Sequence, residues 1–509
     1  MTNGVPKWIG DFDLPRARRN LRVEFLGDWF RDPWRWPELD WLAQRQGASH
    51  IAGRIRADDA FRAYPLDVPK ENFGTRPACI LHPLDRLTYQ SVVDFLSVRL
   101  AGRLPPFVCG WRLRRERPEP GQYARNSFEW SNHRHHLVEF SQRYGLALTT
   151  DIVSYFASID SGRLREVVIR ATRASRAQRR LLSYLDAFEH ATDRPGLPQR
   201  SFASSLLANV FLAPLDDLLL ARSQPVARAR RPSTYSVVRW MDDIWLFGDD
   251  AGALRRSQTE IEAILWDLGL AMNSAKTAIL EGDDLRKRAR QREHSGVEAQ
   301  LAVSGGNDVS GLAELVGRIL EAPESTARTT YRFVLGRIEE HGLVSMAREL
   351  TAIAHRAPHA ADSLADAFRR LGIWRDLVGW YLEYRGSSWS RDLACAHFGR
   401  MFPSNDPSPH DDVIASFEED CSTSDLARVT VALTRLVAWD AGAARSIIRD
   451  AARHADHALL RRAFALAALG ASAERPFIRK LLRSHPENAA LLELIEDRQF
   501  TPFRVPRWF

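Results

Sequence analysis

Two adjacent carboxylates, Asp242 and Asp243, lie inside the run "SVVRWMDDIWLF" (236–247), which is otherwise rich in Val, Ile, Trp and Phe. Branched and aromatic residues favour β-strands, from which Asp is depleted. The pattern therefore predicts a hairpin, with one strand ending near Trp240 and a return strand starting at Ile244. Both carboxylates would stand in the turn at its tip, where their oxygens are available to a metal ion.

The chain contains six Asp-Asp pairs, and only the pair at 242 has apolar β-type runs on both sides. We expect most of the others at solvated turns and helix ends. A polar turn without a metal is the alternative interpretation of Asp242 and Asp243. A third carboxylate at a neighbouring strand end would favour the metal site.

The segment "LALTTDIVSYFASID" (146–160) supplies such a carboxylate. A β-type run from Leu146 to Thr150 ends at Asp151, and a capped helix is predicted from Ser161. If this strand lies beside the hairpin, Asp151 and Asp242 can together hold two Mg²⁺ ions, which would align a 3′ hydroxyl with a nucleoside triphosphate. An ordinary turn or helix-capping residue is the alternative for Asp151.

Composition restricts the class of protein. The 509 residues exceed what one core usually supports, so two or three domains are expected. The net charge of +7, the pI of about 9.4 and the basic clusters at 228–231 and 286–292 favour a polyanionic partner, although a solvated surface would also explain each cluster. The four scattered cysteines and the absence of an apolar signal core predict a cytoplasmic protein without a membrane span.

The chain changes character near residue 295. Earlier residues mix β-type runs with helical segments, whereas later ones are dominated by Ala, Leu and Arg at helical spacing. The Gly- and Ser-containing segment 294–311 reads as a linker. We therefore predict one domain at 1–294 and an α-helical domain at 295–509, either a short solenoid of helix pairs or a plain helical bundle.

Four segments occur in the order and approximate spacing of motifs A to D of reverse transcriptases. They are "TTDIVSYF", "GLPQRSFASSLLANVFLAPLD" (196–216), "VVRWMDDIWLF" and "LGLAMNSAKTAIL" (268–280). Residues 64–96 resemble the fingers of bacterial members, particularly the abortive-infection and phage-defence enzymes. The resemblance covers roughly residues 60 to 285 and implies an α+β fold: a right-hand polymerase palm and fingers, followed by a HEAT-like helical repeat domain.

The resemblance also assigns site residues. It implies a metal-binding set of Asp151, Ile152, Asp242 and Asp243 for two Mg²⁺ ions, with Mn²⁺ as an alternative. It places Phe156 at the aromatic position that excludes a ribose 2′ hydroxyl, unless this ring is a core residue. The substrate-binding set then comprises Phe156, Gln199, Arg200 and Trp240, and Lys276 corresponds to the motif D lysine, with a plain surface lysine as the alternative.

Two positions depart from the family pattern. Motif B usually continues "PQG", but Arg200 stands in place of the glycine, which puts template accommodation in doubt. Trp240 stands where motif C usually has tyrosine. No thumb segment is recognisable after motif D, and the helical domain is a candidate to replace it.

The resemblance implies an RNA-directed DNA polymerase that uses dNTPs, acts on nucleic acid (an RNA template or noncoding RNA and a DNA product) and serves antiviral defence by abortive infection. Two alternatives stay open: a nucleic-acid-binding protein on a decayed polymerase scaffold, and an RNA-dependent RNA polymerase. The second would use "FGDD" (247–250) as motif C, but a predicted helix follows it and leaves no return strand. A homo-oligomer is a further option.

Relatives of this kind can also start synthesis from a protein hydroxyl, which leaves a covalent protein–DNA product. A phenolic oxygen suits that role. Segments that could approach the site contain Tyr64, Tyr123, Tyr331, Tyr381 and Tyr384. A bound nucleic-acid end is the alternative primer.

Overall fold

The computed structural model describes residues 5–43, 47–56, 63–102, 104–192, 196–223, 235–290, 297, 300–301 and 308–497. The chain divides into two compact units. Unit 1 comprises Met1–Asp28, Leu42–Ala63 and Pro83–Arg292, and unit 2 comprises Trp29–Trp41, Tyr64–His82 and Glu293–Phe509. The chain therefore passes from one unit to the other after residues 28, 41, 63, 82 and 292.

Unit 1 is built around a mixed five-stranded sheet with the strand order β3-β5-β6-β4-β7. β3 runs parallel to β5, and the other neighbouring strands are antiparallel. The strands are β3 (Val108–Cys109), β4 (Leu146–Thr150), β5 (Ser236–Trp240), β6 (Asp243–Gly248) and β7 (Ala278–Glu281). The predicted strands before Asp151 and on both sides of the Asp242 turn are thus present.

Successive side chains of each strand point to opposite faces of the sheet, and helices cover both faces. On one face, α6 (Asn126–Arg143) and α13 (Gly282–Arg290) enclose a core that includes Leu137, Val238, Phe247 and Leu285. On the other face, α10 (Phe202–Phe211) and α11 (Ala213–Ser223) receive the side chain of Arg239. These two layers fix the strand ends that carry the carboxylates.

The helix α5 (Pro83–Ala101) is buried on almost every side and therefore lies in the core of unit 1. Buried ion pairs attach it to its neighbours, with Arg54 bound to Asp85 and Arg86 bound to Glu24. The other described helices of unit 1 are α1 (Lys7–Gly10), α2 (Leu14–Phe25), α4 (Gly47–Arg56), α7 (Tyr155–Ser158), α8 (Ser161–Ala171), α9 (Arg176–Thr192) and α12 (Ala251–Asp267).

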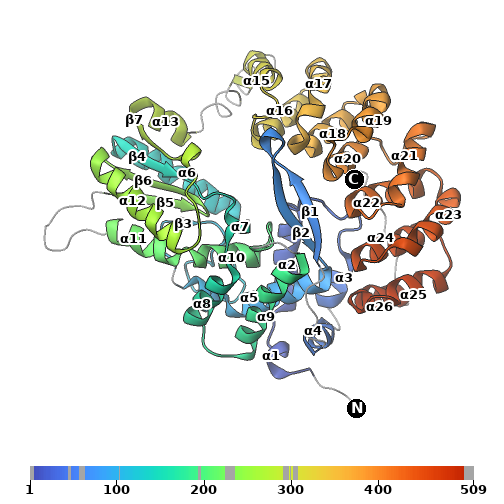
Figure 1. The fold of residues 1–509 in the computed structure, drawn as a ribbon, viewed down its shortest axis with the longest axis horizontal. Helices are drawn as coiled ribbons and strands as arrows, with labels where there is room; N and C mark the ends of the chain where they lie inside the picture. The colour runs from blue at the N-terminus through green and yellow to red at the C-terminus, as the bar shows by residue number, and fades with distance from the viewer. Residues whose placement is uncertain are drawn as a thin grey trace. The chain divides into compact units, whose positions relative to one another are not determined.

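Unit 2 combines a two-stranded hairpin with an array of helices, drawn yellow to red in Figure 1. The hairpin is β1 (Ala63–Pro69) and β2 (Thr75–Leu81), joined through η2 (Glu71–Phe73), and α3 (Pro37–Trp41) precedes it. The main helices are α15 (Ser310–Glu321), α16 (Arg328–Glu340), α17 (Val344–Thr351), α18 (Ala361–Arg370), α19 (Val378–Gly386), α20 (Asp392–Gly399), α21 (Asp411–Cys421), α22 (Leu426–Trp439), α23 (Ala441–Ala451), α24 (Ala458–Gly470), α25 (Arg475–Arg483) and α26 (Ala489–Glu496).

These helices contact their neighbours in a regular order. The helices α16, α18, α20, α22 and α24 form one row, in which each contacts the next, and the odd-numbered helices lie between them in sequence. Contacts restricted to nearby repeats are typical of a solenoid, whereas a bundle would bring distant helices together. The row therefore favours stacked helix pairs over a plain bundle.

The hairpin of residues 64–82 packs against this array. Tyr64 donates a hydrogen bond to the Ser424 carbonyl at 2.6 Å, and the Asn72 amide donates to the Glu324 carbonyl at 2.8 Å. In the same unit, Arg462 binds Asp32 and Glu38 in a fully buried cluster. Unit 2 thus includes two early segments in addition to the residues that follow 292, and the expected fingers region of 64–96 is divided between the units.

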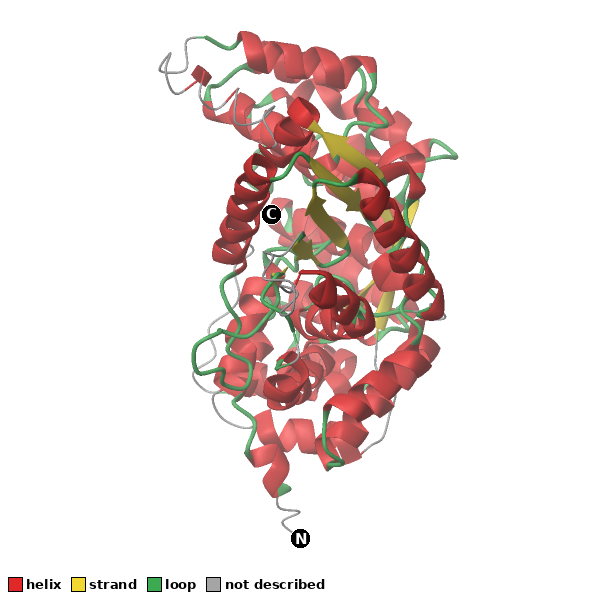
Figure 2. Cartoon of the chain, turned by 90° about the vertical axis from the view of Figure 1, so that its left-hand side faces the viewer, coloured by secondary structure: helices red, strands yellow, loops and turns green. Residues whose placement is uncertain are grey.

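Figure 2 shows the mixed α/β character of the described chain, in which helices outnumber strands. The basic cluster at 228–231 and most of the predicted linker at 294–311 lie outside the described residues. No single described helix is long and apolar enough to cross a membrane, although the bent pair α10 and α11 meets the length and composition criteria jointly. Both helices contribute to the buried core of unit 1.

Candidate active site

The hairpin formed by β5 and β6 carries the two adjacent carboxylates at its tip. Trp240 pairs with Asp243 as the last residues of the ladder, so Met241 and Asp242 alone form the turn. Met241 adopts a positive φ of 57°, as expected in a tight two-residue turn. The return strand therefore starts at Asp243, one residue earlier than the sequence pattern predicts.

Asp151 lies at the end of β4, directly beside this hairpin. β4 pairs antiparallel with β6, and the last pair in register is Thr150 with Ile244. The next residue of β4 is Asp151 and the preceding residue of β6 is Asp243, so the register brings them to the same sheet edge. The structure thus gathers Asp151, Asp242 and Asp243, all partly buried.

The loop before β7 holds the Asp151 side chain. The Lys276 ammonium donates to Asp151 Oδ2 at 3.0 Å, and Asn273 Nδ2 donates to Oδ1 at 3.1 Å. The Asn273 amide also donates to the Asp151 carbonyl at 2.8 Å, and Ile152 forms an isolated bridge with Met272. Lys276 is therefore placed at the carboxylates, and its side chain is also exposed at the surface.

The gathered carboxylates affect one another electrostatically. Burial, followed by repulsion from Asp151, raises the pKa of Asp242 to about 6. Burial also raises the pKa of Asp243 to about 6, and Asp151 again contributes. Burial and mutual repulsion thus make the ionised forms of these carboxyl groups costly, and a bound cation would offset that cost.

The donors at this edge suit a hard cation, because carboxylate oxygens are what Mg²⁺ prefers. Ile152 could add only its backbone carbonyl, since its side chain has no donor atom. Within the described residues, no group of three His, Cys, Asp or Glu side chains is already arranged to hold a metal ion. Asp151 is turned toward Lys276 and Asn273, so a metal would have to replace the ammonium at Asp151.

A buried arginine anchors the hairpin to the helices on one face of the sheet. The sequence pattern did not predict this contact. Arg239 is 0% exposed and binds both Asp216 oxygens, at 2.8 and 2.6 Å. It also donates to Asn209 Oδ1 at 3.0 Å and to the Met241 carbonyl at 2.8 Å. One guanidinium thus ties the turn residue beside Asp242 to helices α10 and α11.

Asp216 belongs to one of the six Asp-Asp pairs and is buried, whereas the described pairs at 249–250, 283–284 and 411–412 are exposed, as expected for most of the pairs. The signal missed in the sequence was an arginine in the middle of an apolar strand, which needs a buried acid. In contrast, Asp249 and Asp250 of "FGDD" lie at the opposite end of β6, where Asp249 accepts from the Gly145 amide and Asp250 caps α12. Their structural roles remove the support for an alternative motif C.

The segment after Asp151 contacts the loop before α10. The Leu197 amide donates to the Phe156 carbonyl at 2.9 Å, and Gly196 has a φ of 94°. A Cβ atom on Gly196 would lie 2.1 Å from the Phe156 oxygen, so only glycine fits there. Tyr155 is buried and donates to the Ala208 carbonyl, whereas the Phe156 side chain is half-buried and is not a core residue.

Gln199 and Arg200 lie in the same loop, immediately before α10. Gln199 is half-buried and Arg200 is exposed. Arg200 adopts a φ of 63°, a conformation that glycine reaches without strain and that other residues rarely adopt. The backbone at this position therefore has a conformation that favours glycine, although an arginine occupies it.

Trp240 faces α6 and lies in a cluster of rings. Its centroid is 4.9 Å from Trp130, 5.4 Å from Trp111 and 5.6 Å from His133. A Cβ atom on Gly110, which has a φ of 77°, would lie 3.1 Å from the indole ring. Trp240 thus packs between β3 and α6 as a structural anchor of the hairpin and does not point freely at a substrate.

All ten tyrosines lie within the described residues, and none of them is exposed. The candidates Tyr123, Tyr331, Tyr381 and Tyr384 are at most 9% exposed, and the Tyr64 hydroxyl is bound to the Ser424 carbonyl. Burial raises the pKa of Tyr64 to about 12. A tyrosine primer would therefore require local opening of the structure shown by the described residues.

Two solved telomerase structures resemble the chain. One is telomerase from Candida albicans in complex with a TWJ fragment of telomeric RNA, with 11% identity, a TM-score of 0.31, and 68% of each chain covered. The other is apo telomerase from Candida tropicalis, with 9% identity, a TM-score of 0.31, and 83% of this chain and 69% of that chain covered.

The likeness to telomerase, a reverse transcriptase, is weak at these scores. No protein-family model matches the chain, and no curated protein matches it.

Proposed function

We propose that the chain is a metal-dependent nucleotidyltransferase, a DNA polymerase of the reverse transcriptase family. The observation that carries this proposal is the meeting of Asp151, Asp242 and Asp243 at one sheet edge, with the pKa values of two of them raised to about 6. A divalent cation bound by these carboxylates would balance their negative charge. The order of the four sequence motifs supports the same activity.

In this proposal, Asp151 and Asp242 hold two Mg²⁺ ions, with Mn²⁺ as an alternative, while Asp243 and the Ile152 carbonyl support them. The metals supply charge neutralisation at the phosphates when bound. The half-buried Phe156 ring excludes the 2′ hydroxyl of ribose, and Gln199 contacts the incoming nucleotide. Lys276, once released from Asp151, would bind phosphate or give a proton to the leaving pyrophosphate.

The proposed biological role is antiviral defence by abortive infection, in the cytoplasm, with an RNA template or noncoding RNA and a DNA product. The motif pattern of bacterial defence enzymes and the helical array after residue 292 support this role.

The test is nucleotide incorporation by the purified full-length chain with labelled dNTPs or rNTPs and Mg²⁺. We expect dNTP incorporation by the parent, and a loss of at least about a thousandfold for Asp242→Asn and Asp151→Asn, because an amide lacks the charge that the metals need. Asp217→Asn, which changes an exposed carboxylate on α11, is the matched control.

Near-parental synthesis by either Asn variant would contradict the metal assignment. Incorporation of rNTPs in preference to dNTPs would indicate an RNA polymerase. If the parent binds nucleic acid but incorporates no nucleotide under any of these conditions, the decayed-scaffold alternative would hold.

A further inference from the structure

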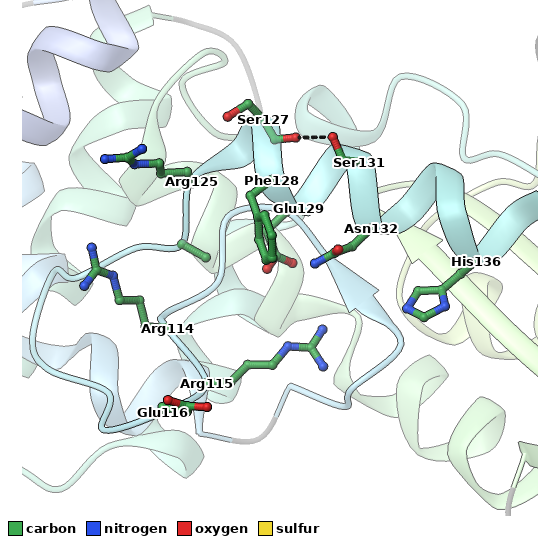
Figure 3. Close-up of a pocket in the computed structure, with 11 residues that line it drawn as sticks. Arg114, Arg115, Glu116, Arg125, Ser127, Phe128, Glu129, Ser131, Asn132 and His136 are labelled. Carbon is green, nitrogen blue, oxygen red and sulfur yellow. Dashed lines mark hydrogen bonds between the residues drawn. The ribbon is translucent and has the colours of Figure 1, made fainter.

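A wide cavity of about 980 Å³ opens beside α6 in unit 1. Its walls are the segment between β3 and α6 and the first turns of α6 itself. Figure 3 shows the Phe128 ring pointing into the space bordered by Arg114, Arg115 and Arg125. The lining is completed by Glu116, Ala124, Ser127, Glu129, Ser131, Asn132 and His136.

The cavity lies at the same end of the sheet as the candidate active site. β3 runs parallel to β5, and its last residue, Cys109, pairs with Trp240, two residues before Asp242. The segment that leaves β3 therefore emerges at the carboxylate edge and continues directly into the cavity wall.

The walls are fixed to the hairpin by several contacts. The Trp111 and Trp130 rings pack against Trp240, and Asn209 donates to the Gly110 carbonyl at 3.0 Å. The Trp111 amide also donates to Asn126 at the start of α6, at 3.1 Å. A ligand in the cavity would consequently be held in register with the hairpin that carries Asp242.

The charges in the cavity are largely available to a ligand. Arg114 and Arg125 are exposed, and neither forms an ion pair with a described residue. Arg115 donates only to the Pro106 carbonyl, at 3.0 Å. Of the two carboxylates in the lining, Glu129 is 3% exposed and accepts from the Gly110 amide, so Glu116 alone opposes the arginines at the surface.

Phe128 provides an apolar element among these charges. Phe128 is 63% exposed, so its ring is accessible to a ligand in the cavity. Exposed aromatic rings flanked by arginines are the common platform for single-stranded nucleic acid, in which bases stack and phosphates pair with guanidinium groups. A duplex would keep its bases stacked inside and leave the ring unused.

We propose that this cavity is a binding site for single-stranded nucleic acid, with phosphates at Arg114, Arg115 and Arg125 and one base stacked on Phe128. The open cavity lies at the upper end of the volumes that enclose small ligands, which favours a strand over a single nucleotide. The inference rests on the proposed function only for the identity of the strand, as template or product, because binding itself requires no catalysis.

The test measures binding of fluorescein-labelled dT20 and rU20 by anisotropy, using the full-length chain in EDTA so that no synthesis occurs. We expect Arg114→Ala/Arg125→Ala to weaken binding at least about tenfold and to reduce the slope of log K against log salt by about 1.4, since each phosphate contact contributes about 0.7 for single strands. Phe128→Ala should weaken binding at least about fivefold.

Three matched variants separate this site from general effects. Arg176→Ala/Arg179→Ala removes two exposed arginines from α9, and Trp266→Ala removes a ring that is 64% exposed on α12. Both should bind like the parent. Arg114→Lys/Arg125→Lys should retain most of the salt-dependent affinity, which would exclude misfolding as the cause of the alanine result.

The outcomes differ from those of the incorporation assay. If Asp242→Asn binds both oligonucleotides normally while the arginine variant does not, the site is supported whether or not the chain is a polymerase. Parental affinity in the arginine variant, or in Phe128→Ala, would overturn the proposal. The proposal would also be overturned if the arginine variant lost binding of dNTPs or of duplex while its binding of dT20 and rU20 stayed unchanged.

Discussion

Removing the buried guanidinium of Arg239 should destabilise the hairpin more than any surface substitution in unit 1. The guanidinium makes bonds of 2.6 to 3.0 Å to Asp216, Asn209 and the Met241 carbonyl, and it is 0% exposed. Arg239→Met would leave the Asp216 carboxylate buried without its cation. Breaking a buried ion pair in this way costs about 3 to 5 kcal/mol.

The assay is urea unfolding at pH 7.5, combined with hydrogen exchange of peptides from β5 and β6, because a chain with two units need not unfold in one step. Arg222→Met is the matched control: its ion pair with Glu260 joins α11 to α12 with about a third of each side chain or more exposed, so its loss should cost less than about 1 kcal/mol. The double variant Arg239→Met/Asp216→Leu should recover most of the lost stability, since it removes the unpaired charge as well.

The pH dependence has a definite sign. Burial already raises the pKa of Asp216, with Arg239 opposing that shift, so the variant's carboxyl should hold its proton to a higher pH. The cost of Arg239→Met should therefore shrink as the pH falls and be smallest below about pH 3, where Asp216 is protonated in both folded and unfolded chains. Equal stability of Arg239→Met and Arg222→Met at pH 7.5, or no recovery in the double variant, would refute this reasoning.

Three further predictions concern the candidate site. Because the raised pKa of Asp242 means that the folded state loses stability as the pH rises from 4 through 6, Asp242→Asn should stabilise the chain by about 3 kcal/mol at pH 7.5 and by less than about 1 kcal/mol near pH 4, as thermal unfolding will show. Mg²⁺ should raise the parent's melting temperature and affect this variant less; an equal response would exclude a metal at Asp242. Phe156→Val should admit rNTPs that the parent rejects, and unchanged dNTP preference with lowered stability would make the ring a packing residue. Arg200→Gly should stabilise the chain by about 1 kcal/mol relative to Arg200→Ala, because both lose the side chain and only glycine relieves the φ of 63°; the reverse order in urea midpoints would contradict this account.

Local sequence patterns predicted the strand ends well, because alternation and β-type composition act over a few residues. The run before Asp151 and the two strands around Asp242 follow from such patterns, and the register between β4 and β6 brings the carboxylates together. The turn differed by one residue, since Trp240 and Asp243 can still pair while Met241 takes a positive φ.

The missed features depend on contacts that are distant in sequence. Arg239 and Asp216 are 23 residues apart, and their charges resemble those of surface residues until both are seen to be buried. The contact between Tyr64 and Ser424 spans 360 residues, so composition near residue 64 gives no sign that this hairpin packs on the helical array. The contact between Lys276 and Asp151 spans 125 residues, so it was likewise not visible in the local sequence pattern.

The passage of the chain between the two units has a consequence for its synthesis. Asp32 lies 430 residues before Arg462, with which it forms a buried ion pair. At the usual rate of about 5 to 20 residues per second, roughly 20 to 90 s separate the emergence of these two side chains from the ribosome. For the first part of that time, until α16 has been made, the apolar residues near Asp32, among them Trp29 and Trp34, which are buried in the finished unit, lack the helices of unit 2 that follow residue 292. A nascent or truncated chain would therefore expose the aromatic segment around Asp32, which is prone to aggregation. Production of the protein in cells then requires that this segment be protected during translation.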